Sequence, residues 1–356
     1  MRAYYLPEIE KLRERIREEK DWIIKNQGEN GAIYFSDSKD SVNPYFACFA
    51  VLGLYAGECR PQDLEAAGNY LRWHCERFLA SDGEIPDYKI QQGVETAEEP
   101  DSVDAYIALY LLALCKKQEV TGSLTENEKR SVKEGIRKLE DMTENGLTNI
   151  SEKSEICYYM DNVEVLAAYR ELGRLAETED EYKDFARQMS RKYKEGLEQL
   201  QKVFWNDKAQ CYIAAKGSAE ALTQEECFLE FYPDAVAQVY GEALELTPQP
   251  SEASGRLWRI FCNYYDWEEM DMGGDDFYWT ELAYIAVRQE DIGRARTYLE
   301  NYFVLTKESR EYPFYIGNSG WAVKTCAELE KYYEKKMNSG LLKDFLEKKA
   351  RRKTNG

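Results

Sequence analysis

Six repetitions of one pattern constrain the fold of this chain more than any other feature of its sequence. In each repetition a charged helix leads through a long loop to a more apolar helix, at an irregular spacing of roughly 40 to 70 residues. Charged helices are expected at 7–26, 61–79, 126–142, 179–204, 251–264 and 292–305, and apolar helices from about residues 43, 101, 161, 233, 275 and 318. The repetition predicts one all-α domain over residues 1–334, an (α/α)6 toroid with six parallel inner helices inside six outer ones.

The stretch 101–114, DSVDAYIALYLLAL, shows most clearly what an inner helix of this chain looks like. It is apolar on every side after its first turn, which is typical of a helix buried all round. Its only charges, Asp101 and Asp104, lie in that first turn. Long loops precede the inner helices and short ones follow them, so we expect functional loops where the inner helices begin. The loops with Asn/Asp-x-Gly predict short hairpins or tight turns, and no alternating pattern is long enough for a sheet of its own.

Charge and histidine content exclude several classes of function. A net charge of −19 disfavours nucleic acid and anionic membranes as partners of the main body, and no apolar stretch predicts membrane insertion. The segment 335–356 differs, because it is basic and amphipathic and could contact a membrane or partner, or be a solvated helix end. The single histidine, His74, excludes zinc sites made of several histidines, His-based epimerases and Ser-His-Asp triads. We therefore expect neither a metal site nor a cofactor.

The nine cysteines fall mostly in apolar runs without a close Cys-x-x-Cys pair. This pattern favours small core residues over a disulfide framework or a zinc site. The chain also begins directly with a charged helix, without an apolar signal core. Together these features predict a cytoplasmic protein.

Acidic or amide side chains mark the start of every expected inner helix. They are Asn43, Asp101 with Asp104, Asp161, Asp234, Asp275 with Asp276, and Asn318. Each alone could be a helix N-cap, which stabilises a helix by about 0.5–2 kcal/mol. If Asp101 caps its helix, however, Asp104 is a second acid at the same end, and the doublet of Asp275 and Asp276 is redundant in the same way. Asp234 follows Pro233 and is explained as a helix start.

Aromatic residues crowd the same positions, among them Tyr45, Tyr159, Trp279 and Trp321. Carboxylates beside flat aromatic faces suit a carbohydrate, whose C–H faces stack on rings while its hydroxyls bind acids. The alternative is that large aromatics fill the wide end of the toroid. Paired carboxylates are also the chemistry of glycosidic cleavage. Because neighbouring helix axes lie roughly 8–10 Å apart, acids from different inner helices favour bracketing a water, and hence inversion.

Two segments resemble the six-hairpin glycosidases, the α/α-barrel superfamily that includes family 8 endoglucanases and unsaturated glucuronyl hydrolases. DSVDAYIALYLLAL is similar to the second inner helix of the family 8 enzymes, which would make Asp101 and Asp104 site residues. YYMDNVEVLAAY is similar to an inner-helix start of the glucuronyl hydrolases, which would make Asp161 a candidate acid/base. Family 8 enzymes carry a glutamate general acid at the first inner helix, where this chain has SVNPYF with Asn43. Another acid, such as Glu84 or Asp276, would then supply the proton, or the reaction has been lost.

These observations predict a glycoside hydrolase that cleaves an oligosaccharide, in a cleft where the inner helices begin. Asp104 and Asp161 are the leading acid/base pair, with Asp101 and Asp276 as further catalytic candidates. The expected substrate-binding residues are Tyr45, Glu84, Tyr159, Asp275, Trp279 and Trp321. The alternative is a carbohydrate-binding or scaffold toroid that has lost the general acid. A terpene-cyclase or prenyltransferase-like toroid is disfavoured, because the chain lacks an Asp-x-Asp-Asp motif and the histidines of a zinc site.

Overall fold

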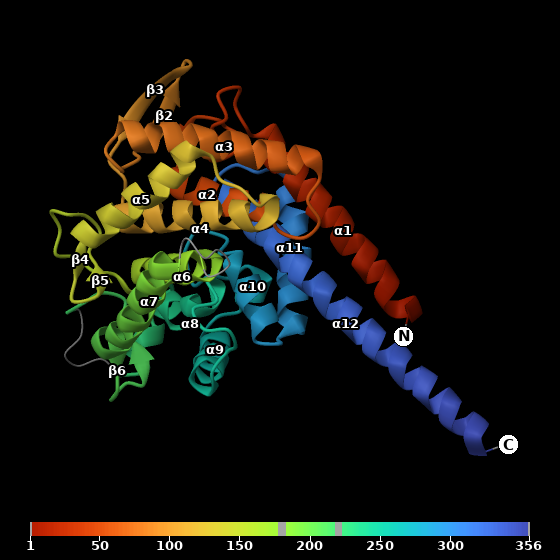
Figure 1. Ribbon diagram of the computed structural model, residues 1–356. Helices are drawn as coiled ribbons and strands as arrows, with labels where there is room; N and C mark the ends of the chain where they lie inside the picture. The colour runs from red at the N-terminus through yellow and green to blue at the C-terminus, as the bar shows by residue number, and fades with distance from the viewer. Residues whose placement is uncertain (1, 177–182, 218–222, 355–356) are drawn as a thin grey trace.

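A computed structural model describes residues 2–176, 183–217 and 223–354 of the chain, and in this part helices alternate between an outer and an inner layer (Figure 1). The outer helices are α1 (Arg2–Lys25), α3 (Pro61–Ala80), α5 (Glu126–Asp141), α7 (Lys183–Phe204), α9 (Glu252–Tyr264) and α11 (Ile292–Glu308). The inner helices are α2 (Pro44–Leu54), α4 (Val103–Thr121), α6 (Tyr159–Ala176), α8 (Val236–Ala243), α10 (Glu281–Arg288) and α12 (Ile316–Thr354). The predicted start of the fourth outer helix at residue 179 lies outside the described residues.

The six inner helices form a closed ring. Each packs against the next in chain order, and α12 packs against α2 to close the circle. At this closure a Cβ on Gly320 would lie 2.1 Å from the carbonyl oxygen of Phe49, so the two backbones touch and only glycine fits. The prediction of an (α/α)6 toroid is therefore confirmed.

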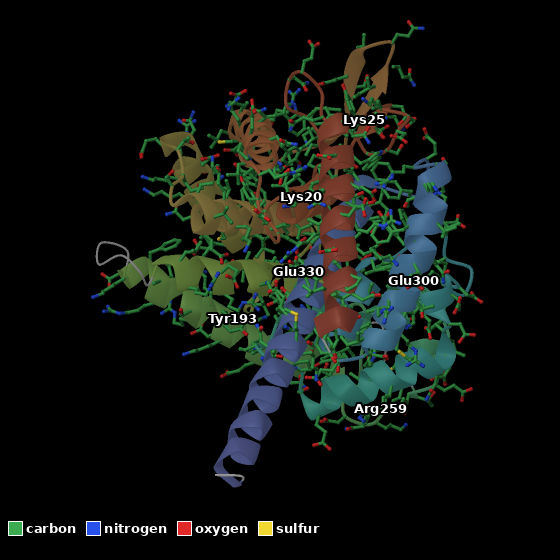
Figure 2. All side chains as sticks on the ribbon, turned by 90° about the vertical axis from the view of Figure 1, so that its right-hand side faces the viewer. Lys20, Lys25, Tyr193, Arg259, Glu300 and Glu330 are labelled. Atoms are coloured by element: carbon green, nitrogen blue, oxygen red, sulfur yellow. A yellow bond between two sulfur atoms is a disulfide. The ribbon has the colours of Figure 1, made fainter. Side chains whose placement is uncertain are left out.

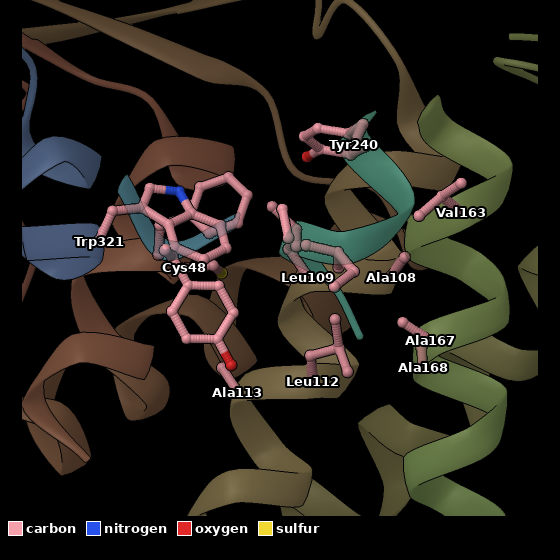
Figure 3. Packing of buried hydrophobic residues seen from close by; sticks show 14 of the residues in the cluster. Cys48, Ala108, Leu109, Leu112, Ala113, Val163, Ala167, Ala168, Tyr240 and Trp321 are labelled. Carbon is pink, nitrogen blue, oxygen red and sulfur yellow. The ribbon is translucent and has the colours of Figure 1, made fainter. Parts of the chain in front are cut away.

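Burial follows the sequence pattern that defines the two layers. In α4 every residue from Val103 to Cys115 is buried, as expected for a helix that is apolar all round. Side chains of α4, including Leu109 and Leu112, lie between those of α6 and Trp321 of α12 (Figure 3). The outer helix α5 is instead amphipathic and begins at a capping box.

The last helix is longer than the toroid needs. Its first half packs along α1, where Arg13 forms ion pairs with Glu330 at 2.5 Å and with Glu334 at 2.9 Å (Figure 2). Its C-terminal part continues away from the rest of the molecule without a break near residue 335 (Figure 1). The side chains of the basic segment from residue 340 onward lie outside the described residues.

Small antiparallel strands lie in the loops that precede inner helices. The pairs β4 (Thr143–Glu144) with β5 (Leu147–Thr148) and β6 (Trp205–Asn206) with β7 (Cys211–Tyr212) confirm the predicted short hairpins. The expectation that no sheet forms is wrong, because β1 (Ser41–Val42), β2 (Asp87–Gln91) and β3 (Val94–Glu98) make a three-stranded sheet. Its hairpin turns at Gln92 and Gly93, both with positive φ (53° and 78°), which suits a tight two-residue turn.

Two inner helices begin later than predicted. Residues Phe231–Ala235 form a wide helical turn before α8, and α10 begins at Glu281 instead of near Asp275. Asp275 Oδ1 accepts hydrogen bonds from Phe277 N at 2.9 Å and Trp279 Nε1 at 2.8 Å. These bonds hold the segment as a turn, because an aspartate that binds backbone just ahead of it competes with helix formation.

Two of the cysteines are paired and others are free. Cys211 and Cys227 form a disulfide, so the expectation that the cysteines stay unpaired is wrong for these two. Cys157 lies in the loop before α6, and Cys48, Cys75, Cys115 and Cys326 are buried and free.

None of the described helices has a stretch both long and apolar enough to cross a lipid bilayer.

Candidate functional site

The first turns of the inner helices meet at one end of the ring, here called the N-terminal end. Asn43, the N-cap of α2, donates from Nδ2 to the Tyr106 hydroxyl of α4 at 3.0 Å. On the other flank of α2 in the ring, Asn318 of α12 donates to Thr280 Oγ1, at the start of α10, at 3.0 Å. The inner helices therefore run in the same direction, and their polar first turns face one another.

Glu164 of α6 is an almost fully buried acid at this end. It is 1% exposed, and its Oε1 accepts hydrogen bonds from Tyr45 of α2 at 2.7 Å and Tyr240 of α8 at 2.5 Å. Its other oxygen, Oε2, is buried and has no hydrogen-bond partner among the described residues. Burial and the nearby Asp161 raise the pKa of Glu164 well above its usual value. Glu164 therefore tends to hold a proton and presents one unused oxygen.

Asp104 and Asp161 lie beside Glu164, and the three are called the acid cluster. Asp104 of α4 is fully buried, and its Oδ2 accepts a hydrogen bond from Thr148 Oγ1 at 2.6 Å. Burial and the charge of Asp161 raise its pKa well above the usual value. Burial and the charge of Asp101 also raise the pKa of Asp161, to about 6. Three neighbouring carboxyls that resist ionisation share protons as a group.

Asp161 has one free binding position. Its Oδ2 is shielded from solvent and has no hydrogen-bond partner among the described residues. The start of α6 therefore offers unused oxygens at Asp161 and, one turn later, at Glu164.

A fourth acid, Glu281, begins α10 on another part of the ring. It is 5% exposed, and its Oε2 has no hydrogen-bond partner in the described part of the chain. Burial and the charge of Asp275 raise the pKa of Glu281 to about 7. The pKa of Tyr240 is raised by its burial and by the charges of both Glu164 and Glu281. This places the Tyr240 hydroxyl within electrostatic reach of both acids.

Asp87 of β2 supplies a carboxylate beside Asn43. Its oxygens accept hydrogen bonds from Tyr106 OH at 2.8 Å and from Asn43 Nδ2 at 2.9 Å. Burial raises its pKa to about 6. Pairing of Val42 with Tyr88 in the β1–β2 ladder brings Asp87 here. A carboxylate therefore lies next to Asn43, the position at which the resemblance to family 8 enzymes implies a glutamate.

Several predicted residues lie at the edge of this end. Asp101 is exposed, and its charge raises the pKa of both Asp161 and Asp87. It does not cap α4, because Ser102 is the N-cap and Asp104 is the second helical residue. Asp276 is exposed and accepts a hydrogen bond from Tyr312 OH at 3.3 Å.

Aromatic side chains at this edge remain open to solvent. Trp279 is half-buried, and its ring lies 5.2 Å from that of Tyr232 between centroids. Tyr232, Tyr158 and Tyr312 are 49%, 38% and 58% exposed. Burial and the charges of Asp161 and Asp101 raise the pKa of Tyr232, which places its ring near these two acids.

Three other predicted residues are not brought together with Glu164. Glu84 is exposed and pairs with Lys138 of the outer helix α5 at 3.2 Å. Tyr159 is buried against Tyr212, with ring centroids 4.6 Å apart. Trp321, in the second turn of α12, is buried against Phe49 and Tyr284 toward the other end of the ring.

His74 lies away from the acids. It is buried, stacks on Tyr110 with centroids 3.9 Å apart, and shares a hydrogen bond with Tyr70 at 3.2 Å. Burial lowers its pKa to about 3, so the ring is neutral. Within the described residues, no group of three or more His, Cys, Asp or Glu is arranged to hold a metal ion.

Glu164, Glu281 and Asp87 were not among the predicted site residues. Glu164 and Glu281 share a signal, because each is the single acid in an apolar stretch of its inner helix (VEVLAAY and ELAYIAV). Such an acid must be buried, and buried acids are costly unless they have a function or a partner. Asp87 carries no such signal, since strand pairing alone brings it to Asn43.

No protein-family model and no curated protein matches this sequence. Solved structures match at low identity over most of the chain. Two are glycosidase variants, one with a TM-score of 0.62 at 13% identity (90% of this chain, 97% of the other) and one in complex with glucose with a TM-score of 0.60 at 13% identity (91% and 98%).

Two further matches are named as a sugar epimerase and as an alpha-1,6-mannanase. A sugar epimerase from a ruminal bacterium has a TM-score of 0.60 at 13% identity, covering 91% of this chain and 98% of the other. An inactive variant of the alpha-1,6-mannanase GH76A of Salegentibacter sp., with two aspartates replaced by alanine and in complex with alpha-1,6-mannotetrose, has a TM-score of 0.52 at 8% identity, covering 90% and 98%. At these identities the matches show the fold alone, and this chain shares with these proteins the (α/α)6 toroid that its sequence predicts.

Proposed function

We propose that this protein is a glycoside hydrolase that cleaves an oligosaccharide at the N-terminal end of the ring. One observation carries the proposal. Asp161 Oδ2, Glu164 Oε2 and Glu281 Oε2 are buried carboxyl oxygens without a hydrogen-bond partner among the described residues. Buried polar atoms nearly always have a partner, so these three suit the hydroxyls and glycosidic oxygen of a sugar.

The difference between two raised pKa values suggests a separate role for each of two of these acids. Glu281, with a pKa of about 7, is partly protonated at neutral pH and is the proposed general acid for the leaving oxygen. Asp161, with a pKa of about 6, is mostly ionised at pH 7 and is the proposed base that activates water. Asp104, which the sequence suggested as one of the pair, is fully buried and bonded to Thr148, and we assign it a positioning role through Asp161.

The arrangement of the helices supports inversion. In the ring, α8 lies between α6, which carries Asp161, and α10, which carries Glu281. Acids on helices that are not neighbours leave room for both a sugar and a water, and inverting enzymes keep their carboxyls about 6.5–9.5 Å apart. Retaining enzymes need a closer pair, at about 5–5.5 Å.

The substrate we propose is a chain of pyranose sugars. The exposed rings of Tyr158, Tyr232 and Tyr312 and the half-buried Trp279 offer flat faces around the acids. Two structurally similar proteins bind glucose and alpha-1,6-mannotetrose. Glucose and alpha-1,6-linked mannose are therefore the first candidates for the repeating unit. The cytoplasmic location inferred from the sequence stays a prediction.

The alternative is a toroid that binds carbohydrate without cleaving it. The observation that favours it is Asn43 at the position where the resemblance implies a glutamate general acid. Asp87 weakens this argument, because its carboxylate is hydrogen-bonded to Asn43.

A product screen tests the proposal. The protein is incubated with oligosaccharides of glucose, of alpha-1,6-linked mannose and of unsaturated uronides, and products are detected by mass spectrometry. We expect cleavage of at least one, loss of cleavage in the Asp161→Asn/Glu281→Gln double variant, and a product of inverted anomeric configuration by proton NMR. The matched control is Asp184→Asn/Glu126→Gln, two exposed acids of outer helices.

Two outcomes would contradict the hydrolase. Cleavage that survives in the double variant would remove these two acids from the mechanism. Thermal stabilisation by one sugar without any product, lost in the double variant, would instead establish the carbohydrate-binding toroid.

A further inference from the structure

The opposite end of the ring contains a cavity of about 590 Å3. Its lining comes from the C-terminal parts of α2, α4 and α6, from residues just after α8, and from α10 and α12. Unequal helix lengths account for it. At about 1.5 Å per residue, the 8-residue helices α8 and α10 end well before the 19-residue α4 and the 18-residue α6. The longer helices therefore form walls around a space that the shorter ones do not fill.

The lining combines aromatic and charged side chains. Trp321 and Tyr284 pack with ring centroids 5.7 Å apart, and Phe49 lies 5.1 Å from Trp321. Five basic and four acidic residues line the cavity, in a chain whose net charge is −19. The lining therefore carries one excess positive charge, unlike the strongly negative chain as a whole, so its formal charge does not oppose an anion.

Lys324 is the basic residue closest to the aromatic rings. Its Nζ lies 3.9 Å from the centroid of Tyr284 and 4.9 Å from that of Trp321. It has two protein acceptors, Ala243 O at 3.3 Å and Glu245 Oε1 at 3.5 Å. An ammonium group has three donors, so Lys324 retains the capacity to bind a further acceptor.

Trp321 provides a second donor from the same helix. Its side chain is 3% exposed, and its Nε1 is buried without a hydrogen-bond partner in the described residues. Residues three apart lie on one face of a helix, so Trp321 and Lys324 are neighbours along α12. An indole N–H and an ammonium can only donate, and both therefore call for a ligand that accepts.

We propose that this cavity binds a small organic oxyanion, a carboxylate or a phosphate ester, with its charged group at Lys324 and Trp321. The apolar or aromatic body of the ligand would contact Phe49 and its apolar neighbours Leu52 and Leu112. The volume falls in the range of small-molecule sites, about 300–1,000 Å3. The site is separate from the acids at the N-terminal end, and its ligand need not be a substrate.

Isothermal titration calorimetry with phenyl phosphate, benzoate and uncharged benzyl alcohol tests the proposal. We expect one of the two anions to bind with 1:1 stoichiometry, at least tenfold more tightly than benzyl alcohol, and the stronger of the two identifies the headgroup. Lys324→Met should weaken binding at least tenfold, and Trp321→Phe about threefold, since a neutral hydrogen bond contributes less than a charged one.

Lys336→Met is the matched control. Lys336 lies on the same helix with its Nζ 5.1 Å from the Tyr332 centroid, but it does not line the cavity. We expect less than a twofold change in affinity. Circular dichroism verifies that each variant is folded, and Trp321→Phe retains a test if Lys324→Met does not fold.

Two results would overturn the proposal. One is the absence of binding of both anions to the wild-type protein at millimolar concentration. The other is anion binding that neither Lys324→Met nor Trp321→Phe weakens.

Discussion

The two ends of the ring are built from the same six helices, yet they treat buried acids in opposite ways. At the N-terminal end Glu281 forms no ion pair within the described part of the chain, and burial and the charge of Asp275 raise its pKa to about 7. At the C-terminal end Glu245 is partly buried, but Lys324, Tyr284 and Arg288 outweigh the effect of burial and lower its pKa to about 2. Burial disfavours the charged form of both, so the neighbouring charge decides the direction.

The same contrast extends to the surrounding residues. Among the described residues, none of Asp104, Asp161, Glu164 and Glu281 forms an ion pair. At the other end Glu171 pairs with Arg170 and Arg174, both at 2.8 Å. Acids without a counter-charge can take up or release protons near neutral pH, whereas paired acids stay ionised. Proton-transfer chemistry is therefore expected only at the N-terminal end.

The largest expected effect is on turnover. Glu281→Gln should lower kcat/KM by about 10²–10⁴, the usual contribution of a general acid. The same change at the other end, Glu245→Gln, should leave kcat/KM within about twofold, because that acid is held by cations. Initial rates on the substrate found in the product screen measure both. Equal losses of kcat/KM in the two variants would contradict the difference proposed between the two ends of the ring.

The next effect concerns stability above neutral pH. The pKa of Glu281 is about 7 in the folded protein and lies near its ordinary value of 4.5 in the unfolded chain. Because the folded state holds the proton more tightly, stability falls as pH rises from about 4.5 through 7. The variant Glu281→Gln cannot ionise. Its free energy of unfolding, relative to that of the wild type, should therefore be about 2–3 kcal/mol higher at pH 8 than at pH 4. Urea unfolding at the two pH values measures this, and a change of the opposite sign would refute the raised pKa.

A bell-shaped pH profile is expected for the reaction. Activity rises as Asp161 ionises near pH 6 and falls as Glu281 loses its proton near pH 7. Activity at pH 5 and at pH 8 should each be about sevenfold below the maximum at pH 6.5. In Glu281→Gln the residual activity should keep the acidic limb and lose the alkaline one. Retention of both limbs would assign the alkaline limb to another group.

The smallest effect is at the C-terminal end. Glu245→Gln removes the partner of Lys324 and Arg288, at 3.5 and 3.8 Å, and should lower the free energy of unfolding at pH 7 by about 1 kcal/mol. The figure is modest because the Glu245 side chain is 41% exposed. Chemical unfolding at pH 7 measures it. A stabilising effect would mean that the cost of burying the Glu245 charge exceeds the stabilisation that Lys324 and Arg288 give it.

Particular residues show what could be predicted from the sequence and why. The apolar periodicity of the stretch from Val103 to Leu114 indicated a fully buried inner helix, and the structure confirms it. Periodicity acts locally, so it predicts a helix and its buried face from neighbours three and four positions away. The predicted start of α10 was wrong by several residues. Asp275 holds a turn, although an aspartate at this position of the sequence could equally have capped a helix.

Site residues divide along the same line. Asp104 and Asp161 were expected together, because both stand in the first turn of inner helices, and the structure brings them into electrostatic contact. Asp87 comes from a strand that pairs with β1, and nothing in its local sequence indicates the contact with Asn43. Trp321 shares the aromatic character of the other candidates, but its place on α12 turns it toward the cavity at the other end.

The sequence by itself determined that this chain forms six helical hairpins and that acids gather where the inner helices begin. Both follow from periodicity and from residue preferences at helix ends, which depend on neighbours along the chain. Only the tertiary structure decided which acids hold protons and which are ionised. That depends on burial and on the charges that other helices bring within a few ångströms, and the same residue type at the two ends of one ring thereby acquires opposite properties.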